Sequence, residues 1–254
     1  ATLTANGQDG GFVRITSSNA DVNLKSSLIQ TNGSSGRGGT IEISGFNKTI
    51  IQDTNIQSKG ITHGGNIYLG NNLNEQTIPF SKYTLIDSTS IIDTTSDVKG
   101  GFVETSGHIL DLLTTINVGR GGMWLIDPYD VTIASSGASG TSYSPSFSAS
   151  QTTTLLASSI VSSLDSGTSV SITTGSSSSN TLTVNAAIAK TSGGNATLTL
   201  TGGTIDINAA ISSTSNDLNL TLNASTVDIG VDLTLNGGNL TVNADVTISA
   251  DVTI

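Results

Sequence analysis

A glycine pair followed by an alternating apolar strand recurs along this chain, and it constrains the fold more than any other feature. The first three pairs begin at Gly10, Gly38 and Gly64, at nearly equal spacing. Further pairs begin at Gly100, Gly121, Gly193, Gly202 and Gly237. Side chains alternate between the two sides of a strand, so the aliphatic residues after each pair would face a core and the polar residues would face solvent.

The length of the repeat favours a solenoid over a meander of hairpins. Hairpins would need tight turns about every 8 to 12 residues, whereas the stronger period here is roughly 20 to 28 residues. That period predicts one coil of a parallel β-helix, with successive coils about 4.8 Å apart. A second apolar segment, around Leu28, Ile56 and Ile92, gives each coil two or three strands. Roughly ten such coils would form a rod on the order of 50 Å long.

The predicted solenoid is continuous, with one interruption. Residues 1–133 carry the coils with glycine pairs, residues 134–167 form a loop and a short amphipathic helix, and residues 168–254 continue as coils rich in Thr and Asn. Leu156, Ile160 and Leu164 recur at helical spacing, with Ser150 as a plausible N-cap and Gly167 as the stop. This pattern predicts a helix over 150–167 that lies against the side of the solenoid or over one end.

Charge and composition narrow the classes of partner. The chain has 9 Lys and Arg against 19 Asp and Glu, and a formal net charge of -10. Residues 121–254 contain one basic residue, Lys190, so nucleic acid and anionic membrane surfaces are poor partners. There is no cysteine for a disulfide or thiolate metal site. The sequence has no apolar run of about 18 residues that would predict a membrane span. We expect the chain to be a fragment or a processed segment of a longer protein.

Two motifs resemble the filamentous haemagglutinin-like exoproteins of bacterial two-partner secretion, a group that includes high-molecular-weight adhesins. One is GGFVETSG over 100–107 and the other is WLIDPYDVTI over 124–133. The matching residues are Gly100, Gly101, Phe102, Val103, Glu104, Gly107, Trp124, Asp127 and Pro128. The secretion domain and the C-terminal toxin or anchor module of that group are not recognisable, so the chain would be part of the passenger rod.

The resemblance implies an all-β fold, a right-handed parallel β-helix, exported through a partner outer-membrane transporter β-barrel. It further implies a secreted protein at the bacterial cell surface, a structural and adhesive rod in contact with a glycan or protein of a host or of other bacteria. We predict no enzymatic activity and no cofactor. The alternative is a self-assembling extracellular filament or biofilm-matrix subunit joined end to end.

A β-helix polysaccharide lyase is a less favoured reading. Such enzymes place carboxylates and basic groups on one exposed face. The candidates here are Asp87, Asp93, Asp97, Glu104 and Asp111, with Arg120 nearby in sequence. Solvated strand and corner positions explain these residues more simply. Ice binding by flat rows of Thr side chains is a further alternative, but a regular Thr-x-Thr pattern on one face of every coil is not sustained through Ile133.

Neither a metal site nor a catalytic residue is predicted from spacing. His63 and His108, the two imidazoles, lack metal-ligand spacing and are read as corner or surface residues. Asp127, Pro128 and Asp130 read as a turn, and Trp124 as a plug of the core. Six sequons, Asn-x-Ser/Thr, are candidate glycosylation sites: Asn32, Asn47, Asn195, Asn219, Asn223 and Asn239.

Overall fold

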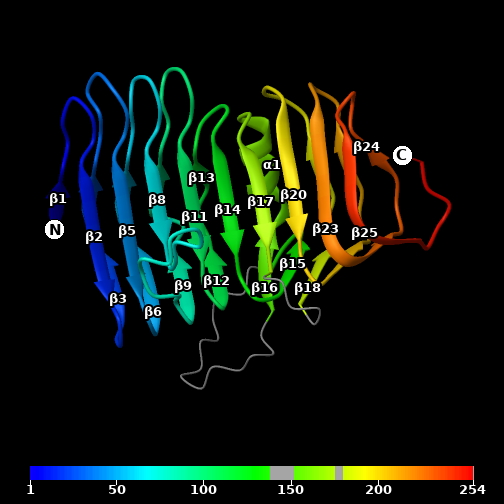
Figure 1. The fold of residues 1–254 in the computed structure, drawn as a ribbon, viewed down its shortest axis with the longest axis horizontal. Coiled ribbons are helices and arrows are strands. Elements are labelled where there is room, and N and C mark those ends of the chain that lie inside the picture. Colours follow the sequence, from blue (N-terminus) through cyan, green and yellow to red (C-terminus); the bar gives the residue numbers. More distant parts are fainter. Residues whose placement is uncertain (138–151, 175–179, 254) are drawn as a thin grey trace.

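The computed structural model describes residues 1–137, 152–174 and 180–253, and these residues wind as a parallel β-helix (Figure 1). Successive coils stack along the long axis of the molecule, and their strands pair in parallel. Strands from equivalent parts of the coils line up into three faces. The prediction of a parallel β-helix is therefore confirmed.

The first face runs the full length of the described stack. Its strands are β2 (Phe12–Ser17), β5 (Thr40–Gly45), β8 (Asn66–Leu69), β11 (Phe102–Ser106), β14 (Met123–Asp127), β17 (Ser169–Thr173), β20 (Ala196–Thr201) and the first halves of β23 (Leu218–Ile229) and β25 (Leu240–Ile248). The inward side chains at equivalent positions of successive strands stack into columns, most of which are aliphatic. Ile41, Ile67 and Val103 are opposite one another in one such column and are fully buried.

The second face has two parts. It begins with β3 (Val22–Lys25), β6 (Lys48–Gln52), β9 (Tyr83–Ile86) and β12 (Ile109–Leu112). It continues with β16 (Thr153–Leu156), β15 (Val131–Ala134), β18 (Thr181–Val184), β21 (Thr204–Ile207) and the second halves of β23 and β25. Since β23 pairs with β20 through its first half and with β21 through its second, the first and second faces merge there.

The third face has the shortest strands. Its elements are β1 (Thr2–Thr4), β4 (Leu28–Gln30), β7 (Asn55–Gln57), β10 (Ile91–Asp93), β13 (Ile116–Asn117), the helix α1 (Ala157–Asp165), β19 (Ile188–Lys190), β22 (Ile211–Ser213) and β24 (Leu233–Thr234). The second apolar segment of each predicted repeat forms this face. Ile29, Ile56 and Ile92 stack there in register.

Coil length differs along the stack. Phe12 is opposite Thr40, and Thr40 is opposite Asn66, so the first two coils are nearly equal in length. The next coil is longer and reaches the opposite position only at Phe102, because an insertion between β8 and β9 folds over the outside of the first face. Figure 1 shows this insertion as the cyan loop in front of the strands. The final described coils are short and lack such excursions.

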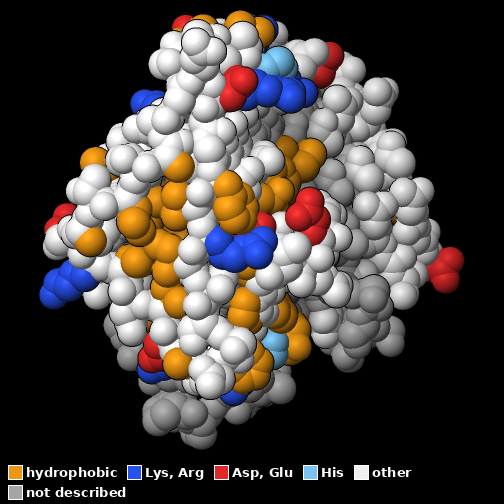
Figure 2. All heavy atoms as spheres, turned by 60° about the vertical axis from the view of Figure 1, so that its left-hand side comes forward, with side chains coloured by type: hydrophobic (Ala, Val, Ile, Leu, Met, Phe, Trp, Pro, Cys, Tyr) orange, Lys and Arg blue, Asp and Glu red, His pale blue; other side chains and the backbone are white. Residues whose placement is uncertain are grey.

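Each coil supplies the cover for the core of its neighbour. In the middle of the stack the sole tryptophan, Trp124, points inward with 1% of its surface exposed, and its Nε1 donates to Thr105 Oγ1 at 3.0 Å. At the N-terminal coil, by contrast, hydrophobic side chains gather on an uncovered surface (Figure 2). Leu3, which is opposite the buried Ile29, is about half exposed there, at 47%. Trp124 is thus a core residue, as predicted.

The helix prediction needs two corrections. Helix α1 spans Ala157–Asp165 with Leu156 as its N-cap, so the helix is shorter than predicted, and Ser150 lies outside the described residues. The segment before it forms β16, because residues 153–156 pair in register with β15 and this pairing overrides the helical spacing. The stop at Gly167 is confirmed: its φ is +77°, and the amides of Gly167 and Thr168 close a Schellman motif on Leu164 and Ser163.

The helix also lies in the wall of the solenoid and not over an end. It occupies the third face between β13 and β19, and Ile160 and Leu164 enter the common core. No helix among the described residues is long and apolar enough to span a membrane.

Strand β16 breaks the order of the chain. Strand β16 follows β15 in the described chain, yet it lies on the side of β15 that faces β12, while β18 pairs with the other side. Contact with β12 is direct, since the Leu110 amide donates to Thr153 Oγ1 at 3.1 Å. One coil therefore places two strands in the second face.

Candidate functional site

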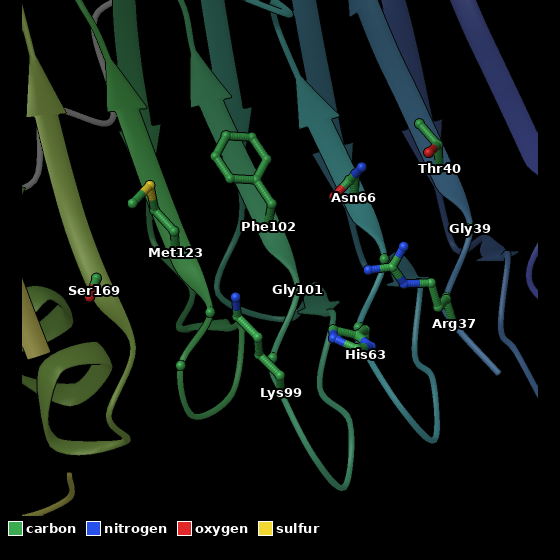
Figure 3. Close-up of a pocket in the computed structure, with 16 residues that line it drawn as sticks. Arg37, Gly39, Thr40, His63, Asn66, Lys99, Gly101, Phe102, Met123 and Ser169 are labelled. Atoms are coloured by element: carbon green, nitrogen blue, oxygen red, sulfur yellow. The ribbon is translucent and has the colours of Figure 1, made fainter. Parts of the chain in front are cut away.

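A groove runs along the corner that leads into the first face, and the glycine pairs form its floor. It has a volume of about 430 Å³ and crosses successive coils at the starts of β5, β8, β11, β14 and β17. Figure 3 shows the groove with its labelled lining residues arranged in two rows. We treat this groove as the candidate functional site.

The glycines are required because the backbone of the preceding coil lies where a Cβ atom would be. A Cβ on Gly39 would meet the carbonyl oxygen of Gly11 at 1.9 Å. A Cβ on Gly65 would lie 2.2 Å from the Gly39 oxygen, and one on Gly101 would lie 2.1 Å from the Gly65 oxygen. This column of glycines keeps the floor bare of side chains, so the groove stays open.

The Gly202 pair departs from the predicted repeat. It lies between β20 and β21, at the corner between the first and second faces, whereas the other pairs precede first-face strands. The glycine-pair motif at Gly202 therefore lies at a different corner of the coil from the other glycine pairs.

A row of basic residues, called here the cation row, consists of Arg37, His63 and Lys99, which line one side of the groove, and Arg120, which follows them in register outside the lining. Arg37 pairs with His63 in a parallel bridge, and His63 pairs with Lys99 in the same way. The Gly64 amide donates to the Lys99 carbonyl at 2.9 Å, and the Gly100 amide donates to the Arg120 carbonyl at 2.8 Å. Arg120 is thus the next member of the row, and its side chain lies over Gly194.

The charges of this row are not neutralised within the described chain. Arg37, Lys99 and Arg120 are exposed and form no ion pair with any described residue. The ion pairs that the structure describes involve Arg14 with Glu42 and Lys59 with Asp93. In an acidic protein, such a line of unpaired cations is a local site for anions.

The other side of the groove carries a strand-start row, defined as Thr40, Asn66, Phe102, Met123 and Ser169. These residues are opposite one another on consecutive first-face strands. They offer hydroxyl and amide groups together with an aromatic ring and a thioether. Figure 3 shows Phe102 and Met123 projecting above the floor while Arg37, His63 and Lys99 lie along the opposite edge.

Sequence reasoning missed the cation row, although the signal was present. Each of the four glycine pairs from Gly38 to Gly121 is preceded by a basic residue or histidine, as RGG, HGG, KGG and RGG. The first pair is preceded by Asp9, and the last three by Ser192, Thr201 and Asn236. The repeat stacks residues at equivalent positions, so this run predicts a row of positive charge over part of the solenoid only.

Three carboxylates, those of Glu42, Glu104 and Asp127, form a second cluster beside the insertion between β8 and β9. Glu42 accepts hydrogen bonds from Asn72 Nδ2 at 3.2 Å and Thr77 Oγ1 at 3.1 Å. Glu104 accepts the Leu73 amide at 2.9 Å. Both glutamates point outward from the first face, yet the insertion buries them.

Burial changes the acidity of this cluster. It raises the pKa of Glu104 to about 7, although hydrogen bonds from Ser106 and Leu73 act in the opposite direction. It also raises the pKa of Asp127 to about 6, against the effect of a hydrogen bond from Asn71. These groups hold the insertion against the wall, so Glu104 of GGFVETSG and Asp127 of WLIDPYDVTI have a structural role.

Asp127 also lines a second cavity of about 400 Å³, together with Phe80 and Tyr129. His108 stacks on Tyr129 with ring centroids 4.1 Å apart. Burial lowers the pKa of His108, and the positive charge of Lys82 lowers it further. The imidazole therefore packs with aromatic rings. No group of three or more His, Asp or Glu side chains suited to a metal ion occurs among the described residues.

The structure does not bring the candidate lyase acids together. Asp93 is on the third face and pairs with Lys59 at 2.9 Å, while Glu104 is on the first face. Asp111 is on the second face and accepts a hydrogen bond from Tyr83. Asp87 caps the turn that contains Ser90. These acids bind local partners on separate faces and do not converge on a groove.

Other motif residues are structural in their contacts. Val103 is buried inside the first face, Gly107 lies at the corner before β12, and Pro128 follows β14. Gly100 and Gly101 belong to the floor of the groove, and Phe102 to its strand-start row.

The six sequons differ in how far their side chains are engaged. Asn47 Nδ2 donates to the Asn19 carbonyl and Asn195 Nδ2 to Asp217. Asn32 accepts the Lys59 amide, and Asn219 accepts the Asn239 amide. Asn223 bonds on both sides, to Thr201 and Asn243. The exposed Asn239 side chain makes no hydrogen bond with described residues, so glycosylation at this position would disturb the stack least.

No protein-family model matches the chain. No curated protein matches it either.

Proposed function

We propose that this chain is a structural and adhesive rod of a secreted bacterial surface exoprotein. The observation that carries the proposal is the stack of coils with an open groove along one corner. Neighbouring coils cover one another's cores, so the solenoid can present a long lateral surface without a large globular core. The GGFVETSG and WLIDPYDVTI motifs support the exoprotein family on sequence resemblance.

In this proposal the chain is exported through an outer-membrane transporter β-barrel and remains at the cell surface or is released. Its targets are glycans or proteins of host cells or other bacteria. It has no catalytic role, in keeping with carboxylates that hold local turns and the insertion on separate faces. A self-assembling filament joined end to end is the alternative role.

The test is an adhesion assay with the purified chain coupled to fluorescent beads. We expect the coated beads to adhere to bacterial or epithelial cells at least ten times more often than beads coated with an unrelated acidic protein. Equal counts for the two bead coatings, on bacterial and on epithelial cells alike, would contradict the adhesive role. Electron microscopy over a concentration series tests the alternative, because end-to-end fibres would replace the adhesin with a filament subunit.

A further inference from the structure

We propose that the basic groove binds a linear polysaccharide that carries carboxylates along its length, with the polymer aligned across the coils. This inference rests on the proposed adhesive role and names the class of ligand at one site. It concerns the cation row and the strand-start row together.

The geometry of the groove fits a repeating ligand. Coils are about 4.8 Å apart, so the backbone positions of Arg37, His63 and Lys99 repeat at a regular step and span roughly 10 Å. The parallel bridges between these residues fix that step. A sugar ring is similar in length to one coil spacing, so a polymer with a carboxylate on every sugar would meet both Arg37 and Lys99.

The charge of the groove selects an anion. The cations have no acidic partner among the described residues, and no carboxylate lines the groove. Two exposed acids lie near the row: Asp9, which accepts the Arg37 amide at 2.8 Å, and Asp97, in the turn before Lys99. Arg37 can bind a carboxylate with two parallel hydrogen bonds, while Lys99 acts as a point charge.

The opposite side supplies contacts suited to sugars. Thr40, Asn66 and Ser169 can exchange hydrogen bonds with ring hydroxyls, and Phe102 with Met123 can pack against the apolar faces of sugar rings. In addition, the Nδ1 atom of His63 is buried and has no hydrogen-bond partner among the described residues. Buried polar atoms without partners are rare, and the residue that carries this one is part of the groove lining.

The same features disfavour duplex DNA. A duplex carries one negative charge per roughly 1.7 Å of its axis and is much wider than one corner of a coil. It would come close to the C-terminal coils, where residues 121–254 contain a single basic residue. Single strands are normally held by several aromatic platforms, and Phe102 is the one aromatic residue in the groove lining.

The experiment measures binding of a defined oligogalacturonate of about ten sugars to the full chain by calorimetry at two salt concentrations. We expect saturable binding that weakens with salt, and no binding of an uncharged galactan oligomer of equal length. The double variant Arg37→Gln/Lys99→Gln should bind about tenfold or more weakly, since each removes a charged contact. Lys25→Gln, an exposed lysine on the second face, is the matched control and should change affinity less than twofold.

Three results would overturn the inference: no saturable binding of the oligogalacturonate, an equal loss in the Lys25→Gln control, or tighter binding of duplex DNA than of the oligogalacturonate. Circular dichroism and melting of each variant establish that it is folded. The bead assay separates the two proposals. Adhesion without oligogalacturonate binding removes the groove ligand alone, and oligogalacturonate binding without adhesion removes the adhesive role.

Discussion

The N-terminal and C-terminal parts of the stack share one backbone plan and differ on the outside. One outward row of the first face, followed in register, begins with Arg14, Glu42, Tyr68, Glu104 and Leu125 and continues with Ser171, Thr199, Thr221 and Thr241. The early positions pair charges or lie under an insertion. The later ones form a plain ladder of hydroxyls. Inward columns stay mostly aliphatic, with Trp124 and Thr105 as exceptions, so the fold depends on the inside and the outside is free to vary.

Coil length varies within the early part of the stack. The coil from Asn66 to Phe102 is long because it carries the insertion, whereas the next coil is short and reaches the opposite position at Met123. The last two coils, from Leu198 to Leu220 and from Leu220 to Leu240, are similarly short. Both candidate sites, the basic groove and the buried carboxylates, belong to the early coils. The late coils thus extend the rod, whereas the early coils carry the features that can bind.

The strongest way to break this comparison is to add one methyl group at a glycine in each part. Gly101→Ala should lower the free energy of unfolding by at least about 4 kcal/mol, above the usual cost of overpacking, because its Cβ would meet backbone of the adjacent coil at 2.1 Å. Gly230→Ala is the matched control, since its nearest neighbour is the Ser249 hydroxyl at 3.2 Å. Urea unfolding measures both. Similar losses would show that close approach of the neighbouring backbone does not set the cost of the added methyl group.

The second test uses pH, because among the described residues it is the N-terminal part that holds buried carboxylates with raised pKa values of about 7 and 6. The folded state holds the proton of Glu104 more tightly than the unfolded chain does. The free energy of unfolding should therefore fall as pH rises from 4.5 to about 7, by on the order of 3 kcal/mol from Glu104, and stay level above that.

Glu104→Gln isolates this effect, because the variant should lose the part of the pH dependence of unfolding free energy that Glu104 contributes. His108 has a lowered pKa and contributes with the opposite sign, but it is present in both proteins and cancels in the difference. Melting temperatures at pH 5 and pH 8 are the measurement. Parallel pH curves for the two proteins would mean that the insertion does not bury Glu104 in solution.

Sequence patterns predicted the parts of this molecule that depend on local repetition. The glycine pairs and aliphatic alternation predicted the parallel coils, the third-face strands around Ile56 and Ile92, and the buried position of Trp124. The stop of the helix at Gly167 was also predictable, since a positive φ there favours glycine.

The remaining features depend on contacts between distant segments. Strand β16 forms because residues 153–156 find an edge of β15, which no local period shows. Glu42 and Glu104 look like solvent-facing strand residues until the insertion covers them. The cation row is an intermediate case: its residues are spaced unevenly in sequence, and only the coil register brings them into line.

A third test concerns the junction between the two parts, where helix α1 replaces a third-face strand. Gly167→Ala should cost about 1 to 2 kcal/mol of unfolding free energy, because its φ of +77° strains a residue with a Cβ and the site closes the helix. Gly167→Asn should recover part of this loss, since Asn tolerates the left-handed region better. Urea unfolding of both variants is the measurement. An unchanged Ala variant would show that the junction tolerates another helix end.

The smallest expected effect probes the polar ladders of the C-terminal coils. Asn243 Nδ2 donates to Asn223 Oδ1 at 2.7 Å, and Asn223 Nδ2 donates to Thr201 Oγ1 at 3.4 Å. Asn223→Ala should therefore lower the free energy of unfolding by about 1 kcal/mol. Asn239→Ala removes an exposed side chain that makes no hydrogen bond with described residues, so it should change stability by less than about 0.5 kcal/mol. If urea unfolding gives equal values for the two variants, the Asn ladders are not part of what holds the late coils together, and their aliphatic columns alone must account for the stack.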